Sequence, residues 1–203
     1  MKPTLPKTAA AAAVSAGALA VGADRQNVQD LVDQIRNGDD EVRGNAWQNA
    51  GPAGAAAIGP LSDLLVHDDF EVARSAKRAM ENIVRYAGRP GADAEARAVE
   101  QALVPLLGHF KTQVRRDALW MLSEIASDAS VGAMARLLKD REVRDDARMT
   151  LQRVPGDMAT MMLQTALNAA PEDFRYNLAE ALRKRGVKVE GYPSQKLQPG
   201  LRP

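Results

Sequence analysis

The fold of this chain is decided by the segment LLKDREVRDDA, residues 137–147. It joins the apolar end of one predicted helix to an acidic turn, and that turn to the start of a new amphipathic helix. The pattern recurs with a valine at its reference position and with Phe174 there in a last copy; the valines are Val42, Val72, Val114 and Val143. Successive reference residues are 30, 42, 29 and 31 positions apart, as the residue numbers show, which indicates a repeat array.

Each copy carries the same short pattern after its reference residue. A small residue follows each valine four positions later, and these residues are Ala46, Ala76, Ala118 and Ala147. An arginine directly follows the reference residue in most copies, as Arg43, Arg115, Arg144 and Arg175. One such unit cannot bury its apolar face alone, but stacked units bury a continuous core. We therefore predict an all-α, right-handed α-solenoid of about four to five helix pairs, in which the arginines donate to the acidic turn of the adjacent repeat. The alternative is that the arginines form a basic stripe for an anionic partner.

Acidic residues precede most of the predicted first helices. Asp39, Asp69 and Asp140 can each accept a backbone N–H at a helix start. The third copy lacks these carboxylates, so we expect Thr112 to cap its first helix. We expect the first repeat to divide into two helices at Gly51-Pro52-Ala53-Gly54, where the glycines serve turns and close packing.

The stretch from Asp40 to Leu65 resembles the bacterial HEAT-like repeats that also occur in phycobilisome-lyase-type proteins. The resemblance lies in the acidic turn with Val42-Arg43, the Ala-rich helix, and the closing Leu61-Ser62-Asp63-Leu64-Leu65. It extends over roughly residues 27–186. The resemblance implies paired antiparallel helices, with the second helix of each pair on the concave side. It implies little about function, because this type of repeat serves many unrelated partners.

Composition narrows the possible functions. The chain has 203 residues, 26% charged and 4% aromatic, with a formal net charge of +1 at pH 7. The near-neutral charge gives no general attraction to nucleic acid or to an anionic membrane. The sequence contains no cysteine, which excludes disulfides, thiolate metal sites and a cysteine nucleophile.

The two ends of the chain differ from the repeats. Residues 1–23 are typical of a secretory signal: Lys2 and Lys7 precede an apolar run, and small residues precede a cut before Asp24. The alternatives are an unstructured Ala-rich terminus in a cytoplasmic protein and an uncleaved anchor. We predict an exported protein, with a repeat domain over residues 24–186, no transmembrane span in the mature chain, and an extended Pro-containing tail over residues 187–203.

The second repeat is longer than the others. We predict a loop over Tyr86–Ala92 and an unusually long second helix over Asp93–Leu107, which together explain the spacing of 42 residues. Insertions in solenoids fall in loops and often mark a special face. A tolerated lengthening of the loop is the simpler explanation of the insertion.

The residue types that could serve catalysis or metal binding have structural explanations in this sequence. His67 and His109 each precede their repeat's valine by five residues, at a helix end where imidazole can meet terminal carbonyls. Neither has a neighbouring His or Cys, and acidic pairs such as Asp145-Asp146 fit capping and solvation. We predict no catalytic residue, no metal ion and no cofactor.

Large exposed side chains would be the signal for a partner. Trp47 and Trp120 are predicted to pack in the core or between repeats, whereas an exposed Trp would anchor a partner. The methionines from Met121 to Met162 are likewise expected to fill the core rather than to form an adaptable binding surface.

These observations favour a non-catalytic scaffold that binds a protein partner on the concave face and acts as a monomer. The predicted contact residues lie on the second helices: Asp63, Arg97, Gln101, Arg136 and Gln164. One alternative is a lyase or chaperone for a chromophore or other prosthetic group, which would need a deep apolar cleft beside Tyr86 and Trp120. A second alternative, nucleic-acid binding, would need a basic concave face.

Overall fold

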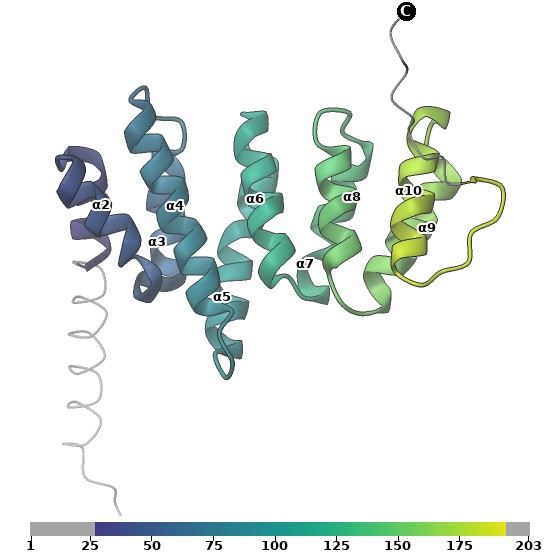
Figure 1. Ribbon diagram of the computed structural model, residues 1–203, viewed down its shortest axis with the longest axis horizontal. Coiled ribbons are helices and arrows are strands. Elements are labelled where there is room, and N and C mark those ends of the chain that lie inside the picture. The colour runs from purple at the N-terminus through teal and green to yellow at the C-terminus, as the bar shows by residue number, and fades with distance from the viewer. Residues whose placement is uncertain (1–26, 194–203) are drawn as a thin grey trace, which may run out of the picture. The chain divides into compact units, whose positions relative to one another are not determined.

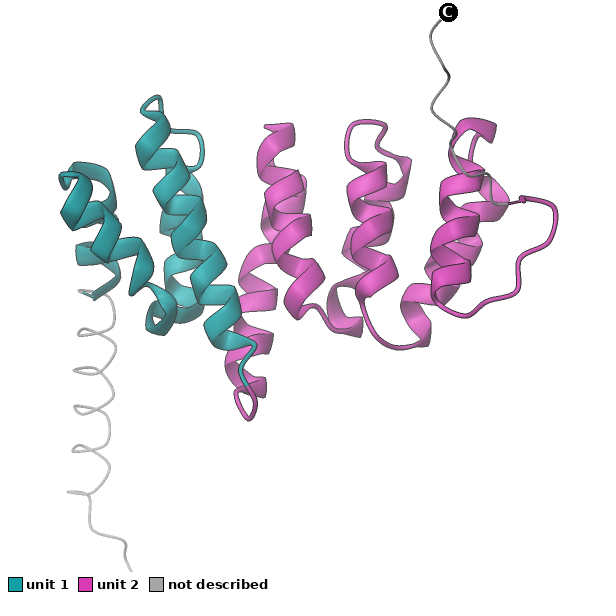
Figure 2. Cartoon of the chain, in the orientation of Figure 1, with its two compact units in different colours: residues 1–89 teal, residues 90–203 magenta. Residues whose placement is uncertain are grey.

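A computed structural model describes residues 27–193 of the chain (Figure 1). The predicted signal segment, residues 1–23, and the last ten residues of the predicted tail lie outside this described part. The described residues form α-helices and short 3₁₀ turns and contain no β-strand. They fall into two compact units that divide between Arg89 and Pro90 (Figure 2).

Unit 1 begins, in its described part, with a helix over residues 27–37 that buries Val28, Leu31, Val32 and Ile35. Then follow α2 (Asp40–Gln48), the 3₁₀ turn η1 (Gly51–Ala53), α3 (Gly54–Leu64) and α4 (Phe70–Ala87). Both α2 and α3 pack against α4. The predicted division of the first repeat at residues 51–54 is confirmed, because η1 occupies it and Gly54 has a positive φ of 60° that suits glycine.

Unit 2 is a stack of helices in two layers (Figure 2). Its elements are α5 (Asp93–Leu103), η2 (Val104–Gly108), α6 (Thr112–Ile125), α7 (Asp128–Arg136), η3 (Leu137–Lys139), α8 (Arg144–Arg153), α9 (Asp157–Ala169) and α10 (Glu172–Lys184). The first helices α6, α8 and α10 pack side by side in one layer, and the second helices α7 and α9 pack on each other in the other. Each pair contributes one turn of the same structure, so the predicted all-α solenoid is confirmed.

Most of the reference residues lie in the cores of the units that contain them. Val72, Val114, Val143 and Phe174 are buried at the start of their helices, as the repeat pattern predicts. Val42 is the exception, with 41% of its surface exposed. In the described part of the chain, only the single helix over residues 27–37 precedes Val42, whereas each of the other reference residues follows a complete helix pair.

Helix starts follow the predicted capping in the first two repeats. Asp39 accepts from the N–H of Val42 at 2.9 Å, and Asp69 accepts from the N–H of Glu71 at 2.8 Å. The prediction for Thr112 is wrong. Lys111 occupies the cap position without a side-chain bond, and the Thr112 hydroxyl donates to Glu142 at 2.5 Å.

The long second helix predicted over Asp93–Leu107 is also wrong in its length. Helix α5 ends at Leu103, and the chain continues as the 3₁₀ turn η2, which has Pro105 in its first turn. Proline lacks an N–H and clashes with the preceding turn, so it ends the α-helix. The predicted loop is shorter as well, because α4 runs for 18 residues up to Ala87.

The last helix ends in a common helix-termination motif. Gly186 adopts a φ of 80°, and the N–H of Val187 donates to the carbonyl of Leu182 at 3.0 Å, which is the Schellman pattern of helix termination. The following residues lie against α10, where Tyr192 meets the ring of Tyr176 edge-on with centroids 5.7 Å apart.

Candidate functional site

The recurring arginines have a structural role in unit 2. Arg115 lies 3.4 Å from Asp140 and 2.8 Å from Glu142 in the next acidic turn, and Arg144 lies 2.6 Å from Asp173. The predicted ladder between adjacent repeats is therefore confirmed for these two arginines. Arg43 and Arg175 instead donate to backbone carbonyls, those of Ile35 and Ala170.

The ladder changes the acidity of its carboxyls. Donation from the Thr112 hydroxyl, and then from Arg115, lowers the pKa of Glu142 below its ordinary value of 4.5. Donation from Arg144 lowers the pKa of Asp173 in the same way. Both carboxyls are therefore ionised at neutral pH, where Glu142 pairs with Arg115 and Asp173 pairs with Arg144.

Two further polar side chains join repeats without being predicted from the sequence. Glu100 of α5 is 2% exposed and accepts from the Ser127 N–H, the Ser127 hydroxyl and the Ser130 hydroxyl at the start of α7. Arg185, after α10, donates to backbone carbonyls at and beyond the end of α8, including that of Leu151. Neither Glu100 nor Arg185 has an equivalent residue in the other repeats, so the repeat pattern of the sequence does not identify them.

The five predicted contact residues are all exposed on second helices. Asp63 lies on α3 in unit 1. In unit 2, Arg97 and Gln101 share α5, Arg136 ends α7, and Gln164 lies on α9. Gln164 also lines a pocket of about 380 Å³ with residues 187–190 at the end of the stack.

The first helices of unit 2 carry a different surface that the sequence analysis did not select. Trp120 on α6 is 47% exposed and Met149 on α8 is 51% exposed. Both follow their reference valine by six residues, so they occupy equivalent places on neighbouring helices. The prediction that Trp120 packs in the core or between repeats is therefore wrong for the exposed half of its surface. The core prediction is also wrong for Met149, Met158 and Met161, whereas Met121 and Met134 are core residues.

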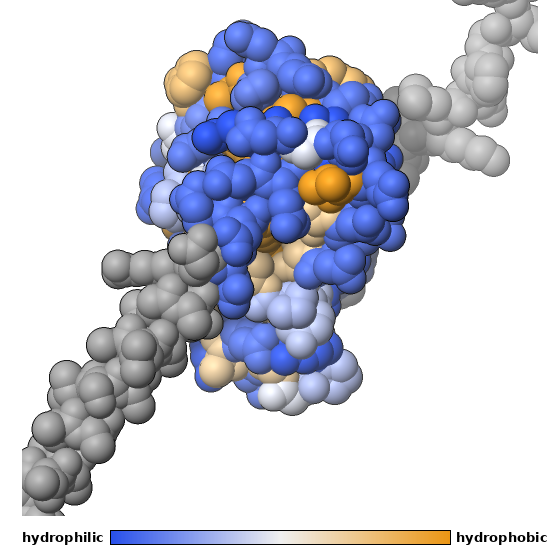
Figure 3. All heavy atoms as spheres, turned by 90° about the vertical axis from the view of Figure 1, so that its left-hand side faces the viewer, coloured by the Kyte–Doolittle hydropathy of each residue, from blue (hydrophilic) through white to orange (hydrophobic). Residues whose placement is uncertain are grey.

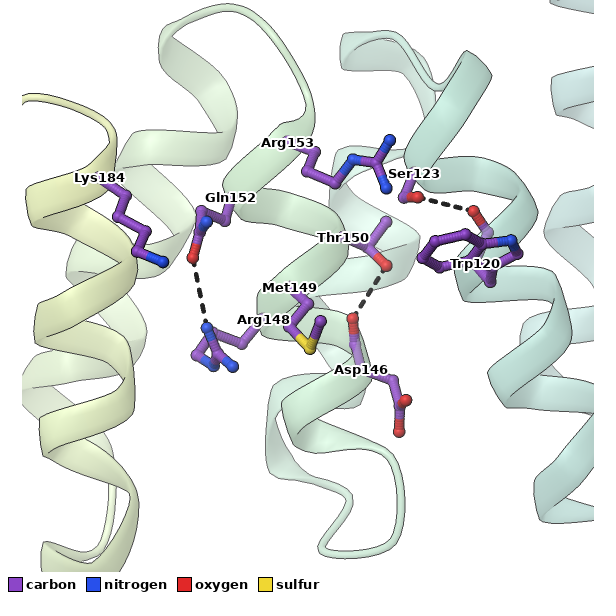
Figure 4. A pocket seen from close by; sticks show the side chains of 9 residues that line it. All are labelled: Trp120, Ser123, Asp146, Arg148, Met149, Thr150, Gln152, Arg153 and Lys184. Atoms are coloured by element: carbon purple, nitrogen blue, oxygen red, sulfur yellow. Dashed lines mark hydrogen bonds between the residues drawn. The ribbon is translucent and has the colours of Figure 1, made fainter. Parts of the chain in front are cut away.

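Trp120 and Met149 line a small pocket of about 200 Å³ (Figure 4). We call it the Trp120 pocket, and its lining residues are Trp120, Ser123, Asp146, Arg148, Met149, Thr150, Gln152, Arg153 and Lys184. Small-molecule sites are usually clefts of roughly 300–1,000 Å³ with a mainly apolar lining. A pocket of this size fits one side chain of a partner better than a prosthetic group.

The charges at the Trp120 pocket are unequal. Three of its lining side chains are cationic and one is acidic. Arg148 is paired with Asp145 at 3.2 Å, and Asp146 is paired with Arg116 at 3.3 Å. Within residues 27–193, Arg153 and Lys184 make no ion pair, which leaves an excess of positive charge beside the two exposed apolar side chains.

Arg153 is held in place by the tryptophan. Its guanidinium lies over the Trp120 ring, 5.4 Å from the centroid. A cation within about 6 Å of an aromatic ring is attracted to its face, and this contact uses none of the hydrogen bonds that the guanidinium can donate to an acceptor. Figure 4 shows Arg153 reaching from α8 toward α6 and Lys184 reaching from α10 toward α8.

A further pocket lies in unit 1, between the helix over residues 27–37 and the α2–η1 segment. It has about 480 Å³ and is lined largely by amide and small side chains, among them Asn27, Gln34, Asn45 and Asn49. Figure 3 views the molecule from this side and shows a mainly hydrophilic surface with small hydrophobic spots. The described residues that line this unit 1 pocket include no aromatic side chain and no cationic side chain.

The histidines differ from their prediction. The Nδ1 atoms of His67 and His109 accept backbone N–H groups two residues later, at 3.0 and 3.1 Å, instead of meeting terminal carbonyls. Over residues 27–193, no three His, Asp or Glu side chains gather as a metal would require. In the same part of the chain, no helix combines the length and apolarity needed to span a bilayer.

Comparisons with known proteins give no family. No protein-family model matches the chain, and no curated protein matches it. Among solved structures, it is similar to a designed armadillo repeat protein in complex with the peptide (KR)4, with 21% identity, coverage of 76% of this chain and 80% of that one, and a TM-score of 0.44.

Two other structures match at a similar level. Computationally designed armadillo repeat proteins for modular peptide recognition match with 23% identity over 76% of this chain and 80% of theirs, at a TM-score of 0.44. An engineered protein matches with 24% identity over 77% of this chain and 78% of its own, at a TM-score of 0.41. At these values the HEAT-like family remains a resemblance, and the finding about this chain itself is its helical-repeat solenoid.

Proposed function

We propose that this chain is a non-catalytic scaffold that binds a polypeptide partner, and that the Trp120 pocket contributes to the contact. The observation that carries the proposal is the pairing of Trp120 and Met149, both half-exposed, at equivalent places on adjacent first helices. Tryptophan and arginine are the residues most enriched at the energetic centres of protein interfaces. Methionine adds an apolar surface that adapts to different partner side chains.

The repeat architecture supports the same function. Each helix pair presents its exposed residues at a regular spacing, so an extended partner can contact several repeats in succession. The second helices offer a separate row in unit 2, with Gln101, Arg136 and Gln164 exposed. We keep this row as a further part of the contact surface, although it carries no exposed aromatic side chain on α5, α7 or α9.

A selection from a random peptide display library on the immobilised full-length chain tests the proposal. We expect enrichment of a recognisable peptide family. In a fluorescence titration, its members should bind the wild type at least 10-fold more tightly than the Trp120→Ala variant, which is the loss expected for one interface anchor. Phe110→Ala is the matched control, because Phe110 is also exposed and in unit 2 but does not line the pocket.

Two outcomes would contradict the proposal at different levels. If no peptide family is enriched from libraries of high diversity, the scaffold function fails. If peptides are enriched but bind Trp120→Ala as tightly as wild type, the scaffold function stands and the assignment of the pocket fails. Arg136→Ala and Gln164→Ala then show whether the second helices hold the contact.

A further inference from the structure

We infer that the Trp120 pocket selects an acidic peptide segment, in which an apolar side chain lies between two carboxylates about three residues apart. This inference rests on the proposed function and adds the chemistry of the partner. It follows from three observations: the apolar pair, the position of the unpaired cations, and the spacing between them.

The apolar pair defines the centre of the site. Trp120 and Met149 come from α6 and α8, and the pocket between them holds about 200 Å³. A leucine, methionine or phenylalanine side chain fits a space of this order. Burial of such a side chain contributes roughly 1.5–3 kcal/mol before the cost of ordering the peptide.

The cations define the charge of the partner. Arg148 and Asp146 are each neutralised by a neighbour within their own surface, Asp145 and Arg116 respectively. Arg153 and Lys184 are the cationic lining residues that remain without an ion pair in the described part of the chain. Charge complementarity therefore favours carboxylates on the bound segment.

The repeat sets the spacing between these two cations. Arg153 follows Val143 by ten residues, and Lys184 follows Phe174 by ten residues, so the two occupy equivalent places on α8 and α10. Packed helices lie about 8–10 Å apart. A peptide in the polyproline II conformation has three residues per turn and advances about 3.1 Å per residue, so carboxylates three residues apart lie on one side of it, about 9 Å apart, and match the two cations.

A peptide fits this surface better than a nucleic acid does. Asp145, Asp146 and Glu142 lie on or beside the same face, and each is in contact with an arginine of the array. A phosphate backbone carries a charge at every nucleotide and would meet these carboxylates as well as the cations. A peptide can place its two carboxylates at Arg153 and Lys184 alone.

The test uses fluorescein-labelled synthetic peptides with the full-length chain. The probe contains Glu-Gly-Leu-Glu within a Gly/Ser frame, and its two comparisons are the Lys-Gly-Leu-Lys and Glu-Gly-Ala-Glu versions. We expect the probe to bind at least 10-fold more tightly than the lysine version and several-fold more tightly than the alanine version. Its binding should weaken several-fold between 50 and 500 mM salt.

A charge reversal in the protein makes the test specific. The Arg153→Glu/Lys184→Glu variant should lose the acidic probe and gain the lysine version, by about 10-fold each. The matched control is Lys139→Glu/Lys188→Glu, which makes the same change in net charge at exposed residues that do not line the Trp120 pocket. A circular dichroism melt of each variant confirms that it is folded.

The alternatives appear as separate results. Equal binding of the acidic and lysine probes, or no reversal in the double variant, overturns the inference. Tighter binding of a labelled oligothymidine than of the acidic probe, with loss in the same double variant, also overturns it in favour of nucleic acid. If display selection yields peptides that need Trp120 but carry no carboxylates, the proposed scaffold function survives and this inference fails.

Discussion

The Nη1 atom of Arg185 lies 3.0 Å from the backbone carbonyl oxygen of Leu151, across one repeat of the array. The same guanidinium donates to the carbonyls of Gln152, Val154 and Gly156 and to the hydroxyl of Thr160. The last carbonyls of a helix have no partner within the helix and need one from outside. Arg185 supplies that partner for α8 from the end of α10.

Replacement of Arg185 should therefore destabilise the end of the stack. We expect Arg185→Ala to lower the free energy of unfolding by about 2 kcal/mol. The variant loses several hydrogen bonds from a charged donor, and water replaces some of these bonds at the freed carbonyls. Urea denaturation followed by circular dichroism measures it. The control Lys188→Ala, at an exposed ion pair with Glu190, should change stability by less than about 0.5 kcal/mol. Equal stability of Arg185→Ala and wild type would show that the contact contributes nothing.

Glu100 gives a second test of the contacts between repeats. Its two carboxylate oxygens take three donors at the start of α7, all within 2.8 Å. Glu100→Ala removes the acceptor of the part-buried Ser127 donors and leaves the buried Ser130 hydroxyl only a long bond to the Ser127 carbonyl, so we expect a loss of about 2–3 kcal/mol in denaturation. Glu100→Gln keeps one acceptor oxygen and should lose about half as much. The neighbouring exposed residue provides the control, because Gln101→Ala should stay within about 0.5 kcal/mol of wild type.

The sequence predicts those parts of the structure that recur at the period of the array. The buried positions of Val72, Val114 and Val143 follow from the spacing alone, because a residue that repeats every 30 or so positions on an apolar face must lie between stacked helices. The ladder of Arg115 and Arg144 follows for the same reason. Periodicity identifies which residues meet when neighbouring units are alike.

The candidate site could not be predicted in this way. Trp120 stands near the register of Trp47 in the sequence, which suggested a shared packing role. Trp47 is in fact half-buried under Arg78, whereas Trp120 is turned to solvent with Arg153 over its ring. A difference of one residue in register rotates a side chain by about 100° around a helix, which is enough to move it from the packed side to the exposed side.

The ladder also predicts a dependence of stability on pH. The lowered pKa of Glu142 means that its contribution to stability is present above pH 4.5 and is lost as the pH falls through the pKa of the folded state. Glu142→Gln lacks this contribution at every pH. The stability difference between wild type and Glu142→Gln should therefore shrink as the pH falls below 4.5, as measured by thermal melts in a series of buffers.

A second variant isolates the cause of this pH dependence. Thr112→Val removes the hydroxyl that is the largest influence on the pKa of the Glu142 carboxyl, so the loss of stability through Glu142 should be smaller than in wild type and should be complete at a higher pH. Parallel stability curves for wild type and Glu142→Gln down to pH 3 would contradict the assignment.

Close packing at Gly51 makes a prediction for unit 1. A Cβ atom at this position would lie 2.9 Å from the Cβ atom of Tyr86, which is closer than side chains approach one another. Gly51→Ala should cost roughly 1–2 kcal/mol, because the η1 turn and α4 must move apart. Gly59→Ala, in the interior of α3 where a Cβ meets nothing within 4 Å, should instead stabilise by about 0.5–1 kcal/mol. Thermal melts of both variants measure the two stability changes, of which the first reflects packing and the second reflects backbone entropy. A Gly59→Ala variant less stable than wild type would contradict the prediction for α3.

The predicted signal segment determines which partners the scaffold can meet. If residues 1–23 direct export, expression of the full-length chain in a bacterial host should give an exported form whose intact mass begins at Asp24. The cut removes Lys2 and Lys7 and no acidic residue, so the formal charge changes from +1 to −1. Replacement of the small residue before the cut, Ala23→Glu, should block processing and accumulate the longer form. A full-length chain confined to the cytosolic fraction would instead contradict export and direct the search for an acidic peptide partner to cytosolic proteins.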